Sequence, residues 1–331
     1  MTHVIPMGDD AMLPPQVGDT VVTVGTFDGV HRGHFDVLAR LCARARATAR
    51  ASLLVTFEPH PLELLRPGAA PSLLTTHDEK LAAIAASGLN YIAILPFTRE
   101  LANHSAEQFV DLLLLGRFGM RELLIGHDHG FGRGREGDVE LLRALGALRG
   151  FGVDVVAPIE TDDGDPVSST RIRRAVECGD LALAAEGLGR RYSVAGTVVR
   201  GAARGRVLGF PTINLVPESP RKLLPPDGVY AVDVESRHGR FGGMMNLGGR
   251  PTFGDDDRVL EAHLFDATGD FYGDHAQVAF VARLRDVQRF NGPSALRAQL
   301  ARDEQGARRA LTLDAEPGNL KGSMRVPPST P

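Results

Sequence analysis

The first half of the chain alternates short apolar runs with segments of helical periodicity. From Val21 to about Gly187, runs rich in β-branched residues are separated by stretches in which apolar side chains recur at helical spacing. This alternation is typical of parallel βαβ units. We therefore predict an α/β domain with a parallel sheet over residues 15–187. Its strands are expected at residues 21–24, 53–57, 91–95, 122–125 and 153–157.

Two helices of this half are marked by the sequence. Leu38, Leu41 and Ala45 recur at helical spacing, so one helix is expected to bury this stripe against the sheet. Ser105 is followed three residues later by Gln108, which is the pattern of a capping box at a helix start. Both signals support helices between the predicted strands.

Beyond Tyr192 the pattern changes to strands with alternating apolar and polar residues, separated by Gly-rich turns. Such alternation is typical of antiparallel sheets with one buried face. We therefore predict an antiparallel β-barrel or sandwich over residues 188–312. Its strands are expected at residues 193–199, 229–235, 260–265 and 278–281.

The chain is predicted to end in a helix and a tail. Pro293 is suited to the first turn of a helix, and Leu296 and Leu300 share one face, so this helix is expected to continue to about residue 311. Residues 313–331 are rich in Pro, Gly and Ser and are expected to be disordered. We find no internal repeat, so the two halves are expected to be different folds.

Composition limits the class of protein. The chain has 331 residues, 43% of them apolar, which is enough for two packed cores. A formal charge of −4 gives no broad basic footprint, so neither nucleic acid nor a membrane is an expected partner. Cys42 and Cys178 indicate neither a disulfide framework nor a Cys-based zinc site. With no signal peptide and no apolar run of about 20 residues, we expect a soluble cytoplasmic enzyme. The oligomeric state is not indicated.

A histidine motif follows the first predicted strand. Residues 25–34 read Gly-Thr-Phe-Asp-Gly-Val-His-Arg-Gly-His and open the first helix. At such a junction in a parallel sheet, backbone N–H groups and the helix dipole attract anions. His31 and His34 can point to one side and bind phosphoryl oxygens, and Gly33 lets a nucleotide approach the backbone. A helix cap is the alternative role of this histidine pair.

A second motif, residues 168–173 (Ser-Ser-Thr-Arg-Ile-Arg), follows the last predicted parallel strand. It offers hydroxyls, backbone donors and guanidinium groups for phosphates, although an ordinary helix cap has the same residues. Residues 132–137 also match the dinucleotide fingerprint G-x-G-x-x-G. They begin about six residues after the fourth strand, whereas this fingerprint normally follows its strand tightly, so we discount the match.

The barrel half carries a different set of polar residues. No Walker-type G-x-x-x-x-G-K-[ST] run occurs, but residues 205–215 form a glycine-flanked loop that leads into a short strand. Thr212 and Asn214 would present oxygen ligands on one face of that strand, which suits ATP-bound Mg²⁺, and a plain turn is the alternative. Glu261 and His263 share one face of another strand, because Leu260, Ala262 and Leu264 occupy its opposite face.

These motifs, in this order, resemble the prokaryotic bifunctional riboflavin kinase/FMN adenylyltransferase family, also called FAD synthetase. The resemblance covers about residues 21–311 and includes residues 56–61 (Thr-Phe-Glu-Pro-His-Pro) and 125–132. It implies a Rossmann-like nucleotidyltransferase domain followed by a β-barrel kinase domain. The implied activities are phosphorylation of riboflavin to FMN by ATP, with Mg²⁺, and adenylylation of FMN to FAD with release of pyrophosphate.

In the first domain, the resemblance implies that His31 and His34 hold ATP phosphates and stabilise charge as the FMN phosphate attacks the α-phosphorus. It implies flavin contacts by Phe57, His60 and Pro61. Residues 127–130 (His-Asp-His-Gly) depart from the aromatic-bearing form usual in the family. The ATP-binding residues implied here are Gly25, Phe27, Gly33, Asp128, Ser168, Ser169, Thr170 and Arg173.

In the second domain, residues 211–214 (Pro-Thr-Ile-Asn) match the family's P-T-A-N motif, with Ile213 in place of alanine. The resemblance implies that Thr212 and Asn214 bind the ATP·Mg²⁺ complex. It implies that Glu261 is the general base that accepts the proton of the riboflavin 5′-hydroxyl. The remaining implied contacts are Gly205 and Gly209 for ATP, and Asn246 and Arg297 for the flavin.

Three other functions remain open at this point. The chain could be a related enzyme with one working half, either the kinase alone or a nucleotidyltransferase for another phosphorylated acceptor. It could also be a non-catalytic flavin sensor, which would be expected to lose Glu261 or the two histidines. Nucleic-acid binding through Arg200, Arg204 and Arg206 is a further alternative, but phosphate binding or solvation explains these arginines more simply. The motifs of both halves are intact, which favours the bifunctional enzyme.

Overall fold

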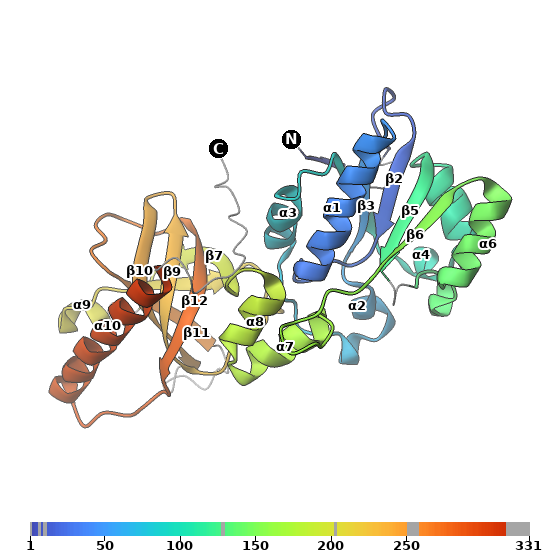
Figure 1. The fold of residues 1–331 in the computed structure, drawn as a ribbon. Coiled ribbons are helices and arrows are strands. Elements are labelled where there is room, and N and C mark those ends of the chain that lie inside the picture. The colour runs from blue at the N-terminus through green and yellow to red at the C-terminus, as the bar shows by residue number, and fades with distance from the viewer. Residues whose placement is uncertain are drawn as a thin grey trace. The chain divides into compact units, whose positions relative to one another are not determined.

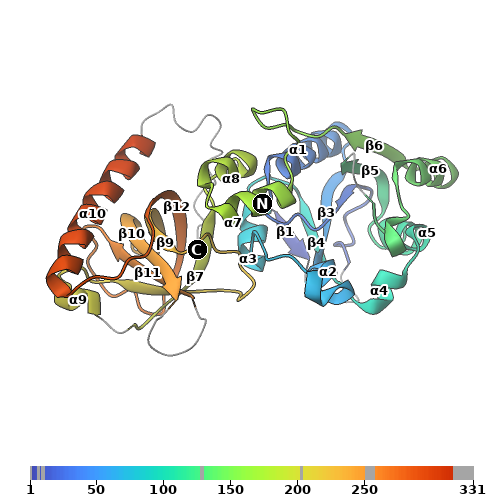
Figure 2. The same cartoon turned by 90° about the horizontal axis from the view of Figure 1, so that it is seen from below.

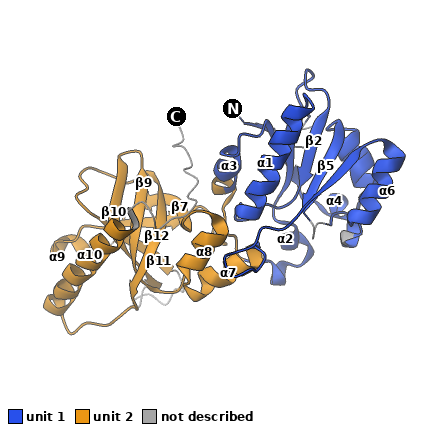
Figure 3. Ribbon diagram, viewed as in Figure 1, with its two compact units in different colours: residues 1–71, 80–168, 326–331 blue, residues 72–79, 169–325 orange. Residues whose placement is uncertain are grey.

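The computed structural model describes residues 2–5, 8, 12–126, 130–201, 204–249 and 258–315. Asp128, which was predicted to bind ATP, lies outside these residues, as do residues 316–331 of the predicted tail. The described chain divides into two compact units (Figure 3). The sheet unit lies within residues 1–71 and 80–168, and the barrel unit lies within residues 72–79 and 169–325.

The sheet unit contains a six-stranded sheet that is parallel throughout, with strand order β1-β4-β3-β2-β5-β6. The five predicted strands of this half are confirmed. The three-residue edge strand β1 was not predicted, because it is too short to show a period. The strands are β1 (His3–Ile5), β2 (Thr20–Val24), β3 (Ala51–Glu58), β4 (Tyr91–Pro96), β5 (Met120–Gly126) and β6 (Gly152–Val156).

Helices cover both faces of this sheet, because successive strand residues point to opposite sides. One apolar cluster includes Val21 of β2 and Leu38 of α1, and the other includes Val22 and Val110. Figure 1 shows α1 running along β2 and β3. The helices in the range of this unit are α1 (Arg32–Ala47), α2 (Pro61–Leu65), η1 (Pro67–Ala69), α3 (His77–Ala85), α4 (Arg99–Asn103), α5 (Ala106–Gln108), η2 (Phe109–Leu115), η3 (Arg133–Arg135) and α6 (Val139–Arg149).

Both helix signals of the first half are confirmed. Leu38, Leu41 and Ala45 are buried on α1. Ser105 caps α5 by accepting from the backbone N–H of Gln108 at 3.1 Å, and the Gln108 side chain accepts from the Ser105 N–H at 2.9 Å. The chain then continues as the π-helical turn η2.

The barrel unit contains a closed antiparallel barrel with strand order β10-β11-β8-β7-β12-β9. Of the two predicted alternatives, the barrel is therefore correct. Strand β10 was not predicted, and β8 is the short strand expected after the glycine loop. The strands are β7 (Ser193–Val199), β8 (Ile213–Pro217), β9 (Gly228–Ser236), β10 (Gly239–Gly249), β11 (Arg258–Leu264) and β12 (His275–Arg285).

Helix α10 (Pro293–Ala315) covers part of the outer surface of this barrel (Figure 2). Leu300 and Leu311 of α10 pack against Ala231 of β9 and Met244 of β10. Leu311 packs on the barrel, and the helix continues beyond it to residue 315. Residues 313–315 are therefore helical, in contrast to the predicted disordered tail.

The barrel unit also includes α7 (Ser169–Cys178), α8 (Leu181–Leu188), α9 (Arg204–Leu208) and the segment Ser72–Glu79. Leu73 of this segment forms a parallel bridge with Lys222. The predicted domain boundary at residues 187 and 188 stays a prediction, and the compact units divide the chain before α7. Within the described part of the chain, no helix combines the length and the apolar character needed to cross a membrane.

Candidate active sites

The loop between β2 and α1 has two residues in an unusual backbone conformation. Phe27 and Val30 have φ angles of +50° and +40°. Residues other than glycine rarely adopt such φ angles, and each such residue costs about 1–3 kcal/mol. Both side chains are buried, and the Val30 N–H donates to the Phe27 carbonyl at 3.1 Å. Burial and this turn hold the loop at the carboxyl end of β2, where ligands of parallel sheets bind.

His31 and His34 cap the start of α1 reciprocally. Nδ1 of His31 accepts from the His34 N–H, and Nδ1 of His34 accepts from the His31 N–H, both at 3.3 Å. The two rings stack with centroids 3.6 Å apart, and Phe27 stacks on His34 at 4.5 Å. Since a backbone N–H can only donate, each Nδ1 carries a lone pair and each neutral ring carries its proton on Nε2. The pair combines the cap with two Nε2–H donors.

Gly25 and Gly33 both lie against aromatic rings of this motif. A Cβ at position 33 would lie 3.2 Å from the His31 ring and 4.0 Å from the Val167 carbonyl oxygen. A Cβ at position 25 would lie 3.0 Å from the Phe27 ring. The packing of the motif therefore already disfavours side chains here, and the residue before Ser168 lies beside the start of α1.

The other predicted phosphate motif begins α7. Ser168 belongs to the sheet unit, whereas Ser169, Thr170 and Arg173 belong to the barrel unit. Nε of Arg173 donates to the Ser72 carbonyl at 2.9 Å, so part of its guanidinium is used within the barrel unit. The ATP contacts of these residues stay predictions.

The residues predicted to contact flavin in the sheet unit follow β3. Phe57 is buried, with its ring edge-on to Phe97 at 5.6 Å. His60 caps α2, because its Nδ1 accepts from the Leu62 N–H at 3.2 Å, and Pro61 is the first residue of that helix. Each therefore has a packing or capping role, and flavin binding stays a prediction for all three.

In the barrel unit, a row of polar residues crosses three neighbouring strands. Asn246 of β10 pairs in register with Glu261 of β11, which pairs with Asn214 of β8. Paired residues of antiparallel strands share one face. Leu260 and Ala262 are buried on the opposite face, so the predicted alternation along this strand is confirmed and the row lies on the outside of the barrel.

Thr212 meets this row from the residue before β8. Its hydroxyl donates to Oε1 of Glu261 at 2.6 Å. Asn214 is buried, and a Cβ at Gly201 would lie 2.1 Å from its amide nitrogen, so a side chain at position 201 would displace this amide. A hydroxyl and a carboxamide beside a carboxylate are the hard oxygen donors that Mg²⁺ prefers, so these residues fit the predicted metal. The described residues hold no cluster of three or more His, Cys, Asp or Glu that could bind a metal.

The glycine loop before Thr212 is closed on itself. The Phe210 N–H donates to the Gly205 carbonyl at 2.8 Å, and a Cβ at position 205 would lie 2.2 Å from the Phe210 carbonyl oxygen. Gly209 has a φ of +88°. Both glycines predicted to contact ATP are thus required by the loop itself, and their ATP contacts stay predictions.

Helix α10 contributes no residue to this row by a described contact. Arg297 is exposed, and no hydrogen bond or ion pair within the described ranges holds its side chain.

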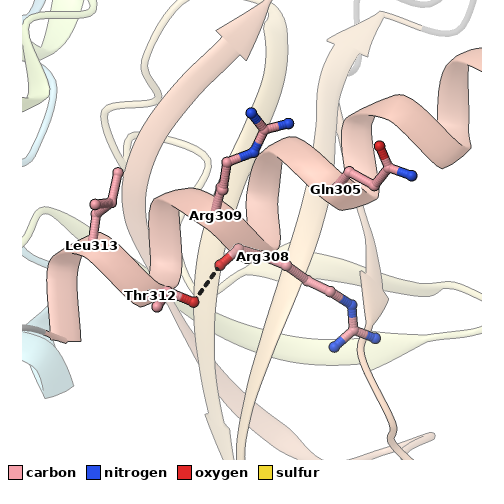
Figure 4. A pocket seen from close by; sticks show the side chains of 5 residues that line it. All are labelled: Gln305, Arg308, Arg309, Thr312 and Leu313. Atoms are coloured by element: carbon pink, nitrogen blue, oxygen red, sulfur yellow. Dashed lines mark hydrogen bonds between the residues drawn. The ribbon is translucent and has the colours of Figure 1, made fainter.

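A shallow depression on α10 contains no predicted site residue (Figure 4). It is lined by Gln305, Arg308, Arg309, Thr312 and Leu313.

Comparison with known proteins covers both units. The FAD synthetase family model matches residues 13–171, and the riboflavin kinase family model matches residues 188–311. The chain is 40% identical to the bifunctional riboflavin kinase/FMN adenylyltransferase of Escherichia coli K12 over 295 residues, covering 89% of this chain and 93% of that protein. The enzyme of the same name from Pseudomonas fluorescens is 38% identical over 297 residues, covering 89% and 94%.

A solved structure agrees in fold. The crystal structure of a macrolide-efflux protein from Streptococcus pneumoniae superposes with a TM-score of 0.81 at 30% identity, covering 90% of this chain and 95% of that one. The relatives cover both the parallel-sheet half and the barrel half of the chain. The chain therefore belongs to the bifunctional riboflavin kinase/FMN adenylyltransferase family.

Proposed function

We propose that this protein phosphorylates riboflavin to FMN in the barrel unit and adenylylates FMN to FAD with the histidine pair of the sheet unit, using ATP in both reactions. The main support is that each unit brings a pair of predicted site residues into contact. The Thr212 hydroxyl lies 2.6 Å from Glu261 in the barrel unit, and His31 and His34 stack at the start of α1 in the sheet unit.

In the kinase reaction, we assign the base to Glu261. Its carboxylate accepts the proton of the riboflavin 5′-hydroxyl as that oxygen attacks the γ-phosphorus, and the bond from the γ-phosphorus to ADP breaks so that ADP leaves. Thr212 and Asn214 would hold the ATP-bound Mg²⁺, which neutralises charge on the phosphates. Asn246, exposed next to Glu261 in the row, is suited to contact the flavin from the neighbouring strand. The hydrogen bond from Thr212 keeps the Glu261 carboxylate in place.

In the adenylyl transfer, the FMN phosphate attacks the α-phosphorus of ATP and pyrophosphate leaves. No covalent enzyme intermediate is needed, because positioning and charge stabilisation are sufficient for such transfers. His31 and His34 donate from Nε2 to phosphoryl oxygens, and the N-terminus of α1 adds its positive dipole end. The hydroxyls and arginines of residues 168–173 are proposed as further phosphate ligands.

We propose that the enzyme acts in the cytoplasm on these small molecules, without nucleic acid or membrane as partner. A flavin sensor is disfavoured because Glu261 and both histidines are present. An enzyme with one working half is disfavoured because the relatives match both halves.

Product chromatography tests the proposal. Wild-type protein, His31→Ala and Glu261→Ala are each incubated with riboflavin, ATP and Mg²⁺. The wild type is expected to form FMN and then FAD, His31→Ala to stop at FMN, and Glu261→Ala to form no FMN but still to convert added FMN to FAD. No flavin product from folded wild-type protein would overturn the enzyme assignment.

A further inference from the structure

His263 contacts the loop that carries Thr212. It lies two residues after Glu261 on the same face of β11, and its Nδ1 lies 2.7 Å from the carbonyl oxygen of Pro211. A carbonyl oxygen can only accept, so Nδ1 carries the proton and donates it to this oxygen. The short distance indicates a well-formed hydrogen bond.

The carbonyl that His263 binds belongs to the peptide unit joining Pro211 to Thr212. A peptide unit is planar and the φ of proline is fixed by its ring, so few freedoms remain on the Pro211 side. Holding the oxygen fixes the plane of this unit and therefore the direction in which the chain enters Thr212. Thr212 in turn places its hydroxyl 2.6 Å from Glu261.

The His263 ring is itself held between aromatic side chains. Phe210 lies edge-on at a centroid distance of 5.3 Å, and Phe265 lies edge-on at 5.8 Å. Both phenylalanines belong to the apolar cluster formed under α10, together with Leu300 and Leu311. Rotation of the ring away from Pro211 would therefore lose its contacts with two members of this cluster.

We propose that His263 is a positioning residue of the kinase site, whose Nδ1–H fixes the Pro211–Thr212 peptide so that Thr212 faces Glu261 and the ATP·Mg²⁺ complex. The inference rests on the proposed kinase function of the barrel unit. His263 acts through Thr212 and has no proton-transfer role. Its loss should therefore weaken the use of ATP more than the use of riboflavin.

Two substitutions test the contact itself. Asparagine carries its amide nitrogen close to the position of Nδ1, whereas glutamine carries it close to the position of Nε2. His263→Gln is expected to lower kcat/KM for ATP by about tenfold or more, as expected for a lost hydrogen bond that displaces a substrate-binding residue. His263→Asn is expected to stay within about threefold of the wild type, because it keeps the donor. The KM for riboflavin should change much less than the KM for ATP in both variants.

Controls separate positioning from folding. Conversion of FMN to FAD by the same preparations reports on the sheet unit, and thermal unfolding reports on the barrel. His275→Asn is the matched control, because His275 is an exposed strand histidine of the barrel that pairs with Glu218. It is expected to leave both flavin activities unchanged.

The outcomes are distinguishable. Absence of FMN from the wild type would overturn the proposed kinase function. If the wild type forms FMN but His263→Gln uses ATP like the wild type, the positioning role is wrong. It is also wrong if folded His263→Asn is impaired as strongly as His263→Gln, or if riboflavin KM rises as much as ATP KM.

Discussion

The Thr212 hydroxyl donates a hydrogen bond to Oε1 of Glu261 at 2.6 Å. The Glu261 carboxylate therefore orients Thr212, which is predicted to bind the ATP·Mg²⁺ complex, and is also the proposed base. Glutamine at position 261 can still accept this hydrogen bond but cannot take up the substrate proton. Glu261→Gln is therefore expected to bind an ATP analogue with Mg²⁺ nearly as the wild type does, while kcat for FMN formation falls by about 10²–10⁴.

Glu261→Ala removes both functions and is expected to weaken ATP binding as well as kcat. Titration calorimetry with a non-hydrolysable ATP analogue and steady-state kinetics measure the two effects separately. Equal ATP affinity in Glu261→Gln and Glu261→Ala would show that the Thr212 contact does not orient the ATP ligand.

The reciprocal cap at α1 predicts that the two ring nitrogens of His31 have separate tasks. His31→Asn keeps an acceptor near Nδ1 but lacks the donor at Nε2, so FAD formation is expected to fall by about 10²–10³ with little loss of stability. His31→Gln keeps a donor near Nε2 and lacks the cap. It is expected to retain more activity and to lose about 1 kcal/mol of stability.

The rates of FMN adenylylation and the thermal unfolding of the two His31 variants check this prediction. FMN formation from riboflavin is the internal control, since it uses the barrel unit. A result in which both variants lose stability and activity equally would contradict the division between the two nitrogens.

Lys222 and Glu79 form a buried ion pair in the barrel unit at 2.5 Å, with side chains only 1% and 6% exposed. Lys222 also donates to the Leu74 carbonyl at 2.7 Å. Burial lowers the pKa of Arg190 to about 10, and the negative charge of Glu79 partly opposes this shift by favouring the charged guanidinium. Glu79→Gln removes the negative charge that faces the buried Lys222 ammonium and is expected to cost about 3–5 kcal/mol of the free energy of unfolding.

Urea denaturation, monitored by the loss of FMN formation, measures the decrease in the free energy of unfolding of the barrel unit. The matched control is Asp286→Asn, because Asp286 pairs with Arg283 on the surface of the same barrel unit, where the side chains are 76% and 36% exposed. That change is expected to cost about 0–1 kcal/mol. A similar, small cost for both variants would mean that the buried pair contributes little.

The two cysteines are expected to differ in reactivity. Burial raises the pKa of the Cys42 thiol, so Cys42 stays protonated at neutral pH, whereas Cys178 is exposed on α7. Iodoacetamide at pH 7.5 should label Cys178 faster than Cys42, because the Cys42 thiol is both buried and harder to ionise. Peptide mass spectrometry of the native and the urea-unfolded protein measures both rates. Equal labelling of the native protein would contradict this prediction.

Periodicity was sufficient for most of the fold, and it failed where glycine replaced the alternating side chains. Strand β10 contains Gly242 and Gly243, which resemble a turn in sequence. In the structure, a Cβ at 242 would lie 2.8 Å from Leu311 of α10, and one at 243 would lie 2.7 Å from the His263 carbonyl oxygen. These glycines permit close approach by other elements, which no local pattern reveals.

The sites were predictable as residue types but not as contacts. The motifs predicted Thr212 and Glu261 for the same kinase site, and the hydrogen bond between them joins residues 49 positions apart through the register of β8 and β11. His263 was noticed only as sharing a face with Glu261, because its partner is a backbone carbonyl that carries no sequence signal. For His31 and His34, the structure shows the helix cap that was one of the two alternatives, and phosphate binding stays a prediction.

The barrel unit includes Ser72–Glu79, which precedes the rest of this unit by about a hundred residues. The entropic cost of closing such a long loop rises only slowly with its length. On the ribosome, this segment emerges long before its partner Lys222, and it must wait for that partner to be synthesised. Division of the gene between the two halves would place Glu79 and Lys222 on separate chains. A barrel unit excised at residue 188 would therefore lack the segment that supplies Glu79 to Lys222.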